Sequence, residues 1–160
     1  MALKVPPSNL AMTLTQGGAD VFVQASVATG LQSPQAYRLA GIAFGFSNAG
    51  LLAISSAQLW NLMLTVTRRT KAALPELTDN DVIKRFSLFS NFVTSGISVF
   101  EGDFYWKPDF EIPLVEDTIY AQLDSDGLGA AVTMNVRLDV EVDRISDIDR
   151  LTILTRSLAD

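Results

Sequence analysis

The 160-residue sequence contains no histidine and no cysteine. The absence of cysteine excludes a disulfide framework and thiolate chemistry. The absence of histidine removes the usual general base near neutral pH and the commonest transition-metal ligand, which excludes Ser-His-Asp catalysis, zinc hydrolysis and histidine proton relays. We therefore expect no catalytic residue, no cofactor and no bound metal, in a protein that is not an enzyme.

Charged side chains are scarce as well. They make up 19% of the chain, against 48% hydrophobic residues, whereas a charged share of about 25% is usual. No apolar run reaches the length of about 18 residues that a membrane helix needs, so no membrane span is expected. The length suits a single domain. Because such a domain would leave apolar surface in water, we expect other chains to cover part of it.

The charges that are present are unevenly distributed. Residues 1–100 hold seven basic and four acidic side chains, residues 101–160 hold five basic and fourteen acidic ones, and the net charge is −6. Opposite signs in two parts of a chain favour head-to-tail contact between copies. Different loops solvated by different charges would give the same distribution, and both interpretations stay open.

The strongest pattern in the sequence is a strict alternation of apolar and polar residues from Val132 to Asp143. A period of two puts the apolar set on one face of a β-strand, as in an antiparallel sheet with one buried and one wet face. Similar patterns predict strands over residues 20–29, 36–46, 59–69 and 118–124, with shorter strands between 96 and 106. Residues 82–93 fit a helix or a strand, and their aromatic content favours a strand.

Glycine, proline and serine indicate where the elements end. Gly41 and Gly45 fall inside a predicted strand, which indicates a bulge or a close approach of another group to the backbone. The segment Ser125-Asp-Gly-Leu-Gly129 is predicted to close a hairpin before the long strand. Its Asp124-Ser-Asp126-Gly127 part resembles half of a calcium loop, but it lacks the terminal glutamate, so we interpret it as a turn.

Ser146 is predicted to begin one helix, because Asp149 follows at the spacing of a capping box. The apolar stripe of this helix is expected to pack on the sandwich or on a neighbouring chain; its residues are Ile148, Leu151, Leu154, Thr155 and Leu158. We expect an extended N-terminal arm over residues 1–18, a β-sandwich domain over 19–145 and a C-terminal helix over 146–160.

The fold class that follows is all-β, an antiparallel sandwich of seven or eight strands. A jelly roll is favoured, because the Cys-Trp-Cys pattern of immunoglobulin domains is missing. Strand pattern, length and Pro/Gly-rich connections over residues 19–143 resemble the single jelly-roll coat proteins of viruses. The resemblance implies a structural subunit of an icosahedral shell, a place in the virion after assembly in the host cytoplasm, and as partners other copies of itself and other virion proteins.

The chain departs from this family in one respect. Many small-virus coat proteins carry a basic N-terminal arm that neutralises the genome, whereas residues 1–18 contain only Lys4 as a basic residue. We therefore expect weak or no nucleic-acid binding. Five basic residues could still form a patch beside neighbouring strands, or be solvated strand ends or partners of the acidic C-terminal region: Arg68, Arg69, Lys71, Lys84 and Arg85.

Aromatic residues give the second group of candidate site residues. Six of the nine phenylalanines lie between residues 86 and 110. A subset there is interpreted as core, as subunit interface, or as a platform on which sugar rings stack: Phe100, Phe104, Tyr105 and Trp106. The platform interpretation gives the alternative function, a carbohydrate-binding β-sandwich. A third hypothesis is a glycosidase-like carboxylate pair at Glu101 and Asp103, which would share one strand face.

Overall fold

The computed structural model describes residues 8–32, 35–46, 54–55, 59–90, 97–98 and 103–158. The elements within these ranges are β1 (Asn9–Thr15), β2 (Val23–Ala28), β3 (Gln35–Phe46), β4 (Ile54–Ser55), β5 (Trp60–Thr67), β6 (Val82–Ser90), β7 (Ile97–Ser98), β8 (Asp103–Trp106), β9 (Pro113–Leu114), β10 (Thr118–Asp126), β11 (Thr133–Arg144) and α1 (Asp147–Leu158). Within these ranges no helix is long and apolar enough to cross a membrane.

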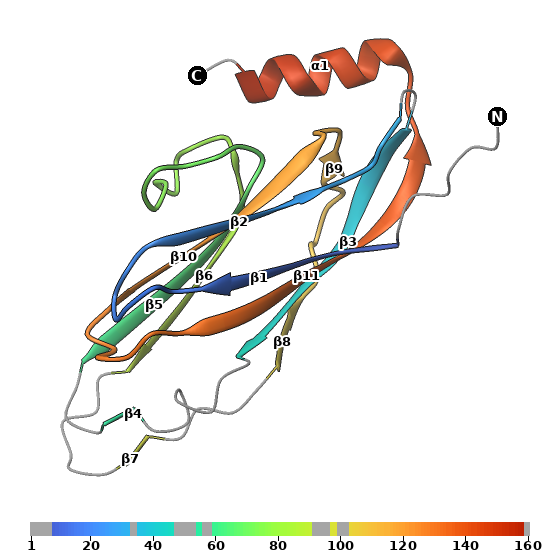
Figure 1. The fold of residues 1–160 in the computed structure, drawn as a ribbon. Helices are drawn as coiled ribbons and strands as arrows, with labels where there is room; N and C mark the ends of the chain where they lie inside the picture. Colours follow the sequence, from blue (N-terminus) through green and yellow to red (C-terminus); the bar gives the residue numbers. More distant parts are fainter. Residues whose placement is uncertain are drawn as a thin grey trace.

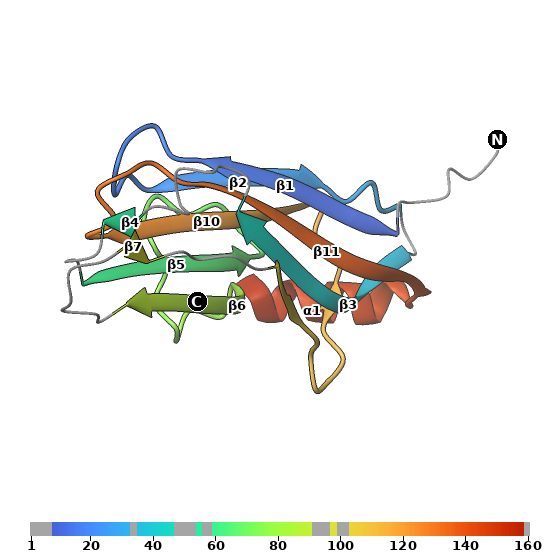
Figure 2. The same cartoon turned by 90° about the horizontal axis from the view of Figure 1, so that it is seen from below.

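The strands form two main antiparallel sheets (Figures 1 and 2). One has the order β1-β11-β3-β8, with β9 also on β3, and the other has the order β2-β10-β5-β6; β4 and β7 pair separately. The first four long strands of the chain each pair with one that returns later, in the pairs β1/β11, β2/β10, β3/β8 and β5/β6. A long hairpin wrapped in this way around a sandwich is a jelly roll, which confirms the predicted fold class.

The core lies between the two sheets and is built by alternation. Leu10 pairs with Leu138 and Met12 with Val136 across β1 and β11, and these side chains are buried. They face the buried apolar residues of β5 and β10 in the second sheet, which are Leu62, Leu64, Val66, Ile119, Ala121 and Leu123. Burial of this apolar surface is the main source of stability. The strand predicted over residues 82–93 is confirmed over Val82–Ser90 as β6, and residues 91–93 lie outside the described residues.

Part of the expected N-terminal arm belongs to the sandwich. Residues 9–15, which we predicted as part of the arm, form β1, and every residue of β1 pairs with β11. The outward residues of this edge strand are small or polar. In the sequence they make the segment look polar, although its inward residues Leu10, Met12 and Leu14 are buried. The polar residues of the segment are therefore the solvent-facing side of an edge strand, and they do not indicate an extended arm.

The predicted hairpin between residues 118–124 and the long strand is wrong. β10 and β11 lie in different sheets, so the turn carries the chain from one sheet to the other. Asp20 holds this turn: its carboxylate accepts hydrogen bonds from the Ser125 hydroxyl at 3.0 Å and from the backbone N–H groups of Gly127 and Leu128 at 3.2 Å. Gly127 has φ of +75°, the conformation that its Asp-Gly context indicated.

The C-terminal helix begins where the sequence predicts. The Ser146 hydroxyl accepts the backbone N–H of Asp149 at 3.1 Å and donates to the Asp149 carboxylate at 2.6 Å, a capping interaction of the expected kind. Figures 1 and 2 place α1 at the opposite end of the sandwich from β4 and β7. The helix is therefore an addition to one end of the jelly roll, directly after β11.

Candidate functional site

The aromatic residues of β8 divide between the two faces of their sheet. Phe104 and Trp106 point inward: Phe104 stacks on Phe44 with ring centroids 4.8 Å apart, and Trp106 meets the edge of Phe86 at 6.3 Å. Phe44 and Phe86 themselves lie 4.7 Å apart. The four rings therefore join β3 and β8 of one sheet to β6 of the other. These two members of the predicted platform contact the core, and Phe100 lies outside the described residues.

Tyr105 points the other way, onto the outer face of the β1-β11-β3-β8 sheet. Its side chain is 59% exposed, and its ring lies across Gly41 of β3, where a Cβ atom would be only 2.8 Å from Cε2 and closer still to the phenol oxygen. The close approach to the backbone that Gly41 predicted is therefore present. The β3 backbone supports one part of the ring and leaves the remainder open to solvent.

Two hollows border Tyr105 on this outer face. The first has a volume of about 500 Å³, and its lining includes small residues of β1 and β3, namely Ala11, Ala43 and Gly45, with Thr13, Asn135 and Arg137 beside them. The second, of about 430 Å³, extends toward the loop after β8 and includes Arg38, Lys107, Asp109, Phe110 and Glu141. Tyr105 lines both, so the ring stands between two adjoining concave surfaces.

The charges around the two hollows are mostly paired. Arg137 Nε lies 2.9 Å from a carboxylate oxygen of Asp139 on the same strand. Arg38 forms ion pairs with Glu111 at 3.1 Å and with Glu141. Hydrogen bonds to Glu141 and then to Glu111 raise the pKa of Arg38 above its usual value. The surface around Tyr105 is therefore rich in hydrogen-bonding groups, with cations and carboxylates side by side.

The five basic candidates do not form one open patch. Arg68 pairs with Glu116 at 2.8 Å, Arg69 with Asp81 at 3.4 Å, and Lys84 lies inward with its ammonium 4.6 Å from the Trp106 ring centroid. Arg85 is on the outer face of β6, where its Nε and Nη2 atoms are buried without a hydrogen-bond partner. Most of these basic side chains are thus paired with a carboxylate or lie over an aromatic ring.

Lys71 connects two aspartates of the loop between β5 and β6. Its ammonium lies 2.6 Å from Asp79 and 2.9 Å from Asp81. Desolvation lowers the pKa of Lys71, but the hydrogen bonds and charges of the two carboxylates together raise it above its usual value. The hydrogen bond from Lys71, helped by the backbone N–H of Asp81, lowers the pKa of Asp79.

Helix α1 turns an apolar stripe away from its own sandwich. Ile148 is 75% exposed and Leu151 63%, and together with Thr152, Thr155 and Arg156 they line a shallow concave surface. The opposite face carries the partly buried Arg150, Ile153 and Leu154. Arg150 lies 3.7 Å from Asp117 and donates to the Val115 carbonyl at 3.5 Å.

The predicted stripe of α1 is therefore divided between two faces. Leu154 turns toward the sandwich, whereas Ile148, Leu151 and Thr155 turn away from it. The sequence pattern predicted a single packing surface, whereas Ile153 and Leu154 are partly buried on the opposite side of the helix. The adjacent pair Ile153-Leu154 was the available signal, because residues next to each other on a helix cannot both belong to the centre of one stripe.

Other large apolar side chains are exposed in scattered positions of the described chain. Phe89 on β6 and Phe110 after β8 are 73% and 71% exposed, and Leu59 and Leu77 are comparable. Exposed large apolar groups gathered in patches mark interaction sites. Within the described part of the chain, exposed apolar residues coincide with a concave surface at the outer stripe of α1 and around Tyr105.

Two candidates from the sequence remain, the turn considered for calcium and the carboxylate pair considered for hydrolysis. No group of three or more acidic side chains within the described residues is arranged to hold a metal ion. At the turn considered for calcium, an oxygen of Asp124 accepts the Ser125 backbone N–H at 3.0 Å. Of the carboxylate pair considered for hydrolysis, Glu101 lies outside the described residues, as does the side chain of Asp103.

Comparison with known proteins gives structural likeness only. No protein-family model and no curated protein matches the sequence. Similar solved structures include the coat protein VP1 of Trichodysplasia spinulosa-associated polyomavirus, at 7% identity with a TM-score of 0.47, covering 88% of this chain and 96% of that one. A cowpea mosaic virus particle protein matches at 8% identity with a TM-score of 0.44, covering 91% and 89%.

A carbohydrate-binding module of family 32 from C. perfringens NanJ, solved with galactose, is also similar, at 12% identity with a TM-score of 0.34, covering 81% of this chain and 93% of that one. Viral coat proteins are thus among the structures that this chain resembles, as the sequence suggested. Because a sugar-binding module is among them too, the likeness does not choose between the two functions, and the proposals below depend on the chain's own residues.

Proposed function

We propose that the protein is a structural subunit that assembles with copies of itself into a shell, as a viral coat protein does. The observation that carries this proposal is the outward stripe of α1, with Ile148 and Leu151 largely in water although they belong to an amphipathic helix. In this proposal the stripe is covered by a second copy of the chain. The sandwich is the rigid body, and α1 is the element that reaches between copies.

The argument begins with the length of the helix. An isolated helix of 12 residues is marginal in water, and most helices of this size depend on tertiary packing. Among the helix residues whose burial is described, 147–156, the packed face supplies Arg150, Ile153 and Leu154. A helix that is apolar on two opposite sides is normally buried on both. A second copy lying on Ile148 and Leu151 completes that burial and adds about 1.5–3 kcal/mol for each side chain fully covered.

Charge supports a contact of defined register. Asp147 and Asp149 stand at the start of the helix and Arg156 in its last turn, so the apolar stripe is bordered by opposite charges at its two ends. Complementary rim charges steer association and fix the orientation of partners more than they add affinity. Two copies that approach with their helices antiparallel would bring the acidic end of each stripe to the basic end of the other.

The proposal includes the location and partners that the resemblance to coat proteins implies. The protein would be part of a virion, assembled in the host cytoplasm from copies of this chain and with other virion proteins as further partners. Nucleic-acid binding would be weak, because Arg68, Arg69 and Lys71 already face carboxylates and Lys84 faces Trp106. Little unpaired positive charge then remains for phosphates.

Sedimentation of the purified protein tests the proposal. We expect larger species to form as concentration rises, and the double variant Ile148→Ser, Leu151→Ser to weaken assembly at least about tenfold, since removal of two buried apolar side chains exceeds 1.4 kcal/mol. Leu77→Ser, at a comparably exposed leucine in the loop between β5 and β6, is the matched control and should assemble like the original. A strict monomer at every concentration, salt and pH would refute the proposal, and electron microscopy would show whether the assembly is a closed shell.

A further inference from the structure

A second surface suggests a ligand, independently of assembly. The outer face of the β1-β11-β3-β8 sheet bears Tyr105 between two adjoining hollows of about 500 and 430 Å³. Each volume lies in the range of about 300–1,000 Å³ that is typical of small-molecule sites. An exposed aromatic ring at the junction of two such hollows is unusual for a plain outer sheet face, which is expected to carry polar side chains in contact with water.

The position of the ring is determined by the residue beneath it. Tyr105 pairs with Ala43 across β8 and β3 and leans over Gly41, the only residue type that leaves room for its phenol there. The sheet thus supports the ring from below, while more than half of the side chain stays accessible. A ring held in this way needs little ordering when a flat ligand stacks on it.

Polar groups line one side of this platform at regular intervals. Asn135, Arg137 and Asp139 are successive outward residues of β11, about 7 Å apart from one to the next. The Thr13 hydroxyl donates to Asn135 Oδ1 at 2.9 Å, which orients that amide. Arg137 is oriented in turn by its ion pair with Asp139. The row therefore presents oriented donors and acceptors beside an aromatic face.

The charge of the site favours a neutral ligand. The two arginines at the hollows, Arg137 and Arg38, each face carboxylates, namely Asp139, Glu111 and Glu141. Lys107 and Asp109 of the second hollow add one charge of each sign. A phosphate or a sulfated ligand would meet these carboxylates, whereas a neutral polyhydroxylated ligand uses both the donors and the acceptors.

We infer that Tyr105 and the row Asn135, Arg137 and Asp139 bind a neutral oligosaccharide, with one sugar ring stacked on Tyr105 and its neighbours in the two hollows. A pyranose has an apolar face of C–H groups and a rim of hydroxyls, which match the ring and the polar row in turn. The inference goes beyond the proposed assembly and does not depend on it. It also differs from the platform expected from the sequence, because Phe104 and Trp106 face the core.

Saturation-transfer NMR and calorimetry with chitotriose, cellotriose and β-1,4-galactotriose test the inference, each sugar at up to about 10 mM so that a Kd of about 1 mM is measurable. We expect at least one trisaccharide to bind. Tyr105→Ala should weaken that binding at least about tenfold through loss of the stacking surface. Tyr105→Phe should keep most of the affinity, and Arg137→Ala should weaken it about threefold.

The matched control is Phe89→Ala, which removes another strongly exposed aromatic ring, on the other sheet, and should bind like the original. The inference is overturned if none of the three sugars binds, or if Tyr105→Ala binds as well as the original. It is also overturned if Tyr105→Ala weakens self-association in sedimentation while no sugar binds, because the hollows would then be a contact between copies. Loss of assembly in the α1 variant would leave the sugar titration unchanged, so the two proposals fail separately.

Discussion

Tyr105 of β8 lies across Gly41 of β3 so closely that no side chain can be added at position 41 without moving the tyrosine ring. The atoms that would collide belong to the far end of the Tyr105 side chain, which is exposed and can rotate. We predict that Gly41→Ala lifts the ring off the sheet at a cost of about 1 kcal/mol or less in unfolding free energy, a typical cost for a change at a surface.

NMR of the Tyr105 ring signals, assigned with the Tyr105→Phe variant, measures the displacement, and urea unfolding measures the cost. Gly17→Ala is the control, because a Cβ at position 17 meets no atom within 4 Å. Unchanged Tyr105 signals in Gly41→Ala would contradict the described contact. A displaced ring in a stable protein would also provide a second way to weaken the sugar binding inferred above.

Asp20 is the acceptor for three donors of the turn that links the two sheets. We predict that Asp20→Ala lowers the unfolding free energy by about 2–4 kcal/mol, because several donors lose a charged acceptor at once. Asp20 also has φ of +55°, a conformation that alanine tolerates poorly and asparagine tolerates well. Asp20→Asn should therefore cost clearly less.

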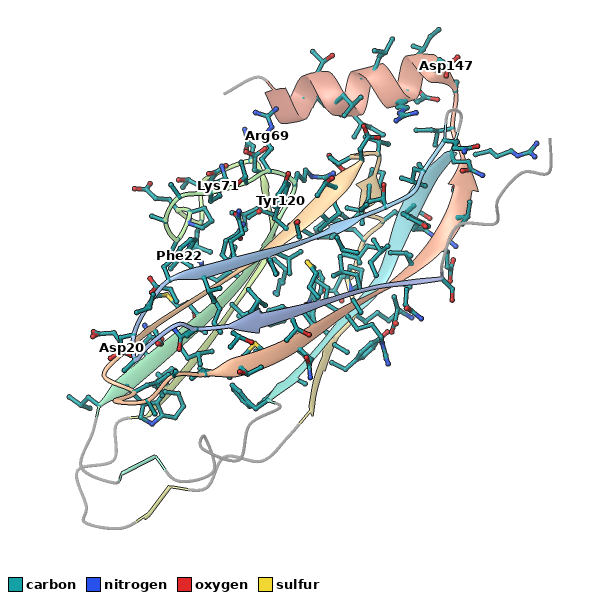
Figure 3. The ribbon with its side chains drawn as sticks, viewed as in Figure 1. Asp20, Phe22, Arg69, Lys71, Tyr120 and Asp147 are labelled. Carbon is teal, nitrogen blue, oxygen red and sulfur yellow. The ribbon has the colours of Figure 1, made fainter. Side chains whose placement is uncertain are left out.

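Urea unfolding of the two Asp20 variants, with Asp126→Ala at a nearby exposed position as the control, checks this prediction. Equal stability of Asp20→Ala and the control would mean that the turn does not depend on the carboxylate. Figure 3 places Asp20 at the end of the sandwich away from Asp147. The substitution should therefore leave α1, and with it the proposed contact between copies, intact.

The sequence predicts the local features of this fold and misses those that depend on distant partners. Alternation located β11, and Ser146 with Asp149 located the start of α1, since both signals lie within a few residues. The assignment of β10 and β11 to different sheets depends on pairing with β2, β5, β1 and β3. No turn sequence encodes that choice, and Asp-Gly suits a hairpin and a crossing between sheets equally well.

The same limit applies to the candidate site. The aromatic residues were recognised from the sequence, and alternation along β8 already implies that Tyr105 differs from Phe104 and Trp106. Which of the two sets faces solvent depends on the pairing of β8 with β3. The small residues of the first hollow lie on two strands that are far apart in the sequence, Ala11 on β1 and Ala43 with Gly45 on β3, so this hollow could not be found before the register of the sheet was known.

Arg68 and Glu116 form a nearly buried ion pair, with side chains only 13% and 10% exposed. Arg68 also donates to the Pro113 carbonyl, and Glu116 accepts the Val115 backbone N–H. We predict that Glu116→Ala destabilises the protein by about 3–5 kcal/mol, because it leaves a buried guanidinium without its counter-charge. Arg68→Met combined with Glu116→Leu should recover much of that loss, since no unpaired charge remains.

A double-mutant cycle in urea unfolding measures the coupling between the two residues. Additive effects of the single and double variants would show that the pair does not act as a unit. Arg38→Met with Glu111→Leu, at an exposed pair, is the matched control and should show a coupling of less than about 1 kcal/mol.

The Lys71–Asp79 pair predicts a pH dependence with a defined sign. The pKa of Asp79 is lower in the folded chain than its ordinary value of 3.8, so this group stabilises the fold above pH 3.8 and loses its effect as the pH falls through the folded pKa. The pKa of Lys71 is raised above 10.5, so its contribution is complete below pH 10.5 and is lost as the pH rises through the folded pKa.

The variant Asp79→Asn isolates the acidic limb. It should be less stable than the original protein near neutral pH, and the difference between the two should shrink as the pH falls below 3.8, because the original then loses the same carboxylate charge. Urea midpoints from neutral pH down to about pH 2.5 measure this convergence, on the principle that stability follows the difference in bound protons. Asp143→Asn, an exposed strand-end carboxylate, is the control. A difference between Asp79→Asn and the original that stays constant across this range would show that the ionised form of Asp79 does not stabilise the loop between β5 and β6.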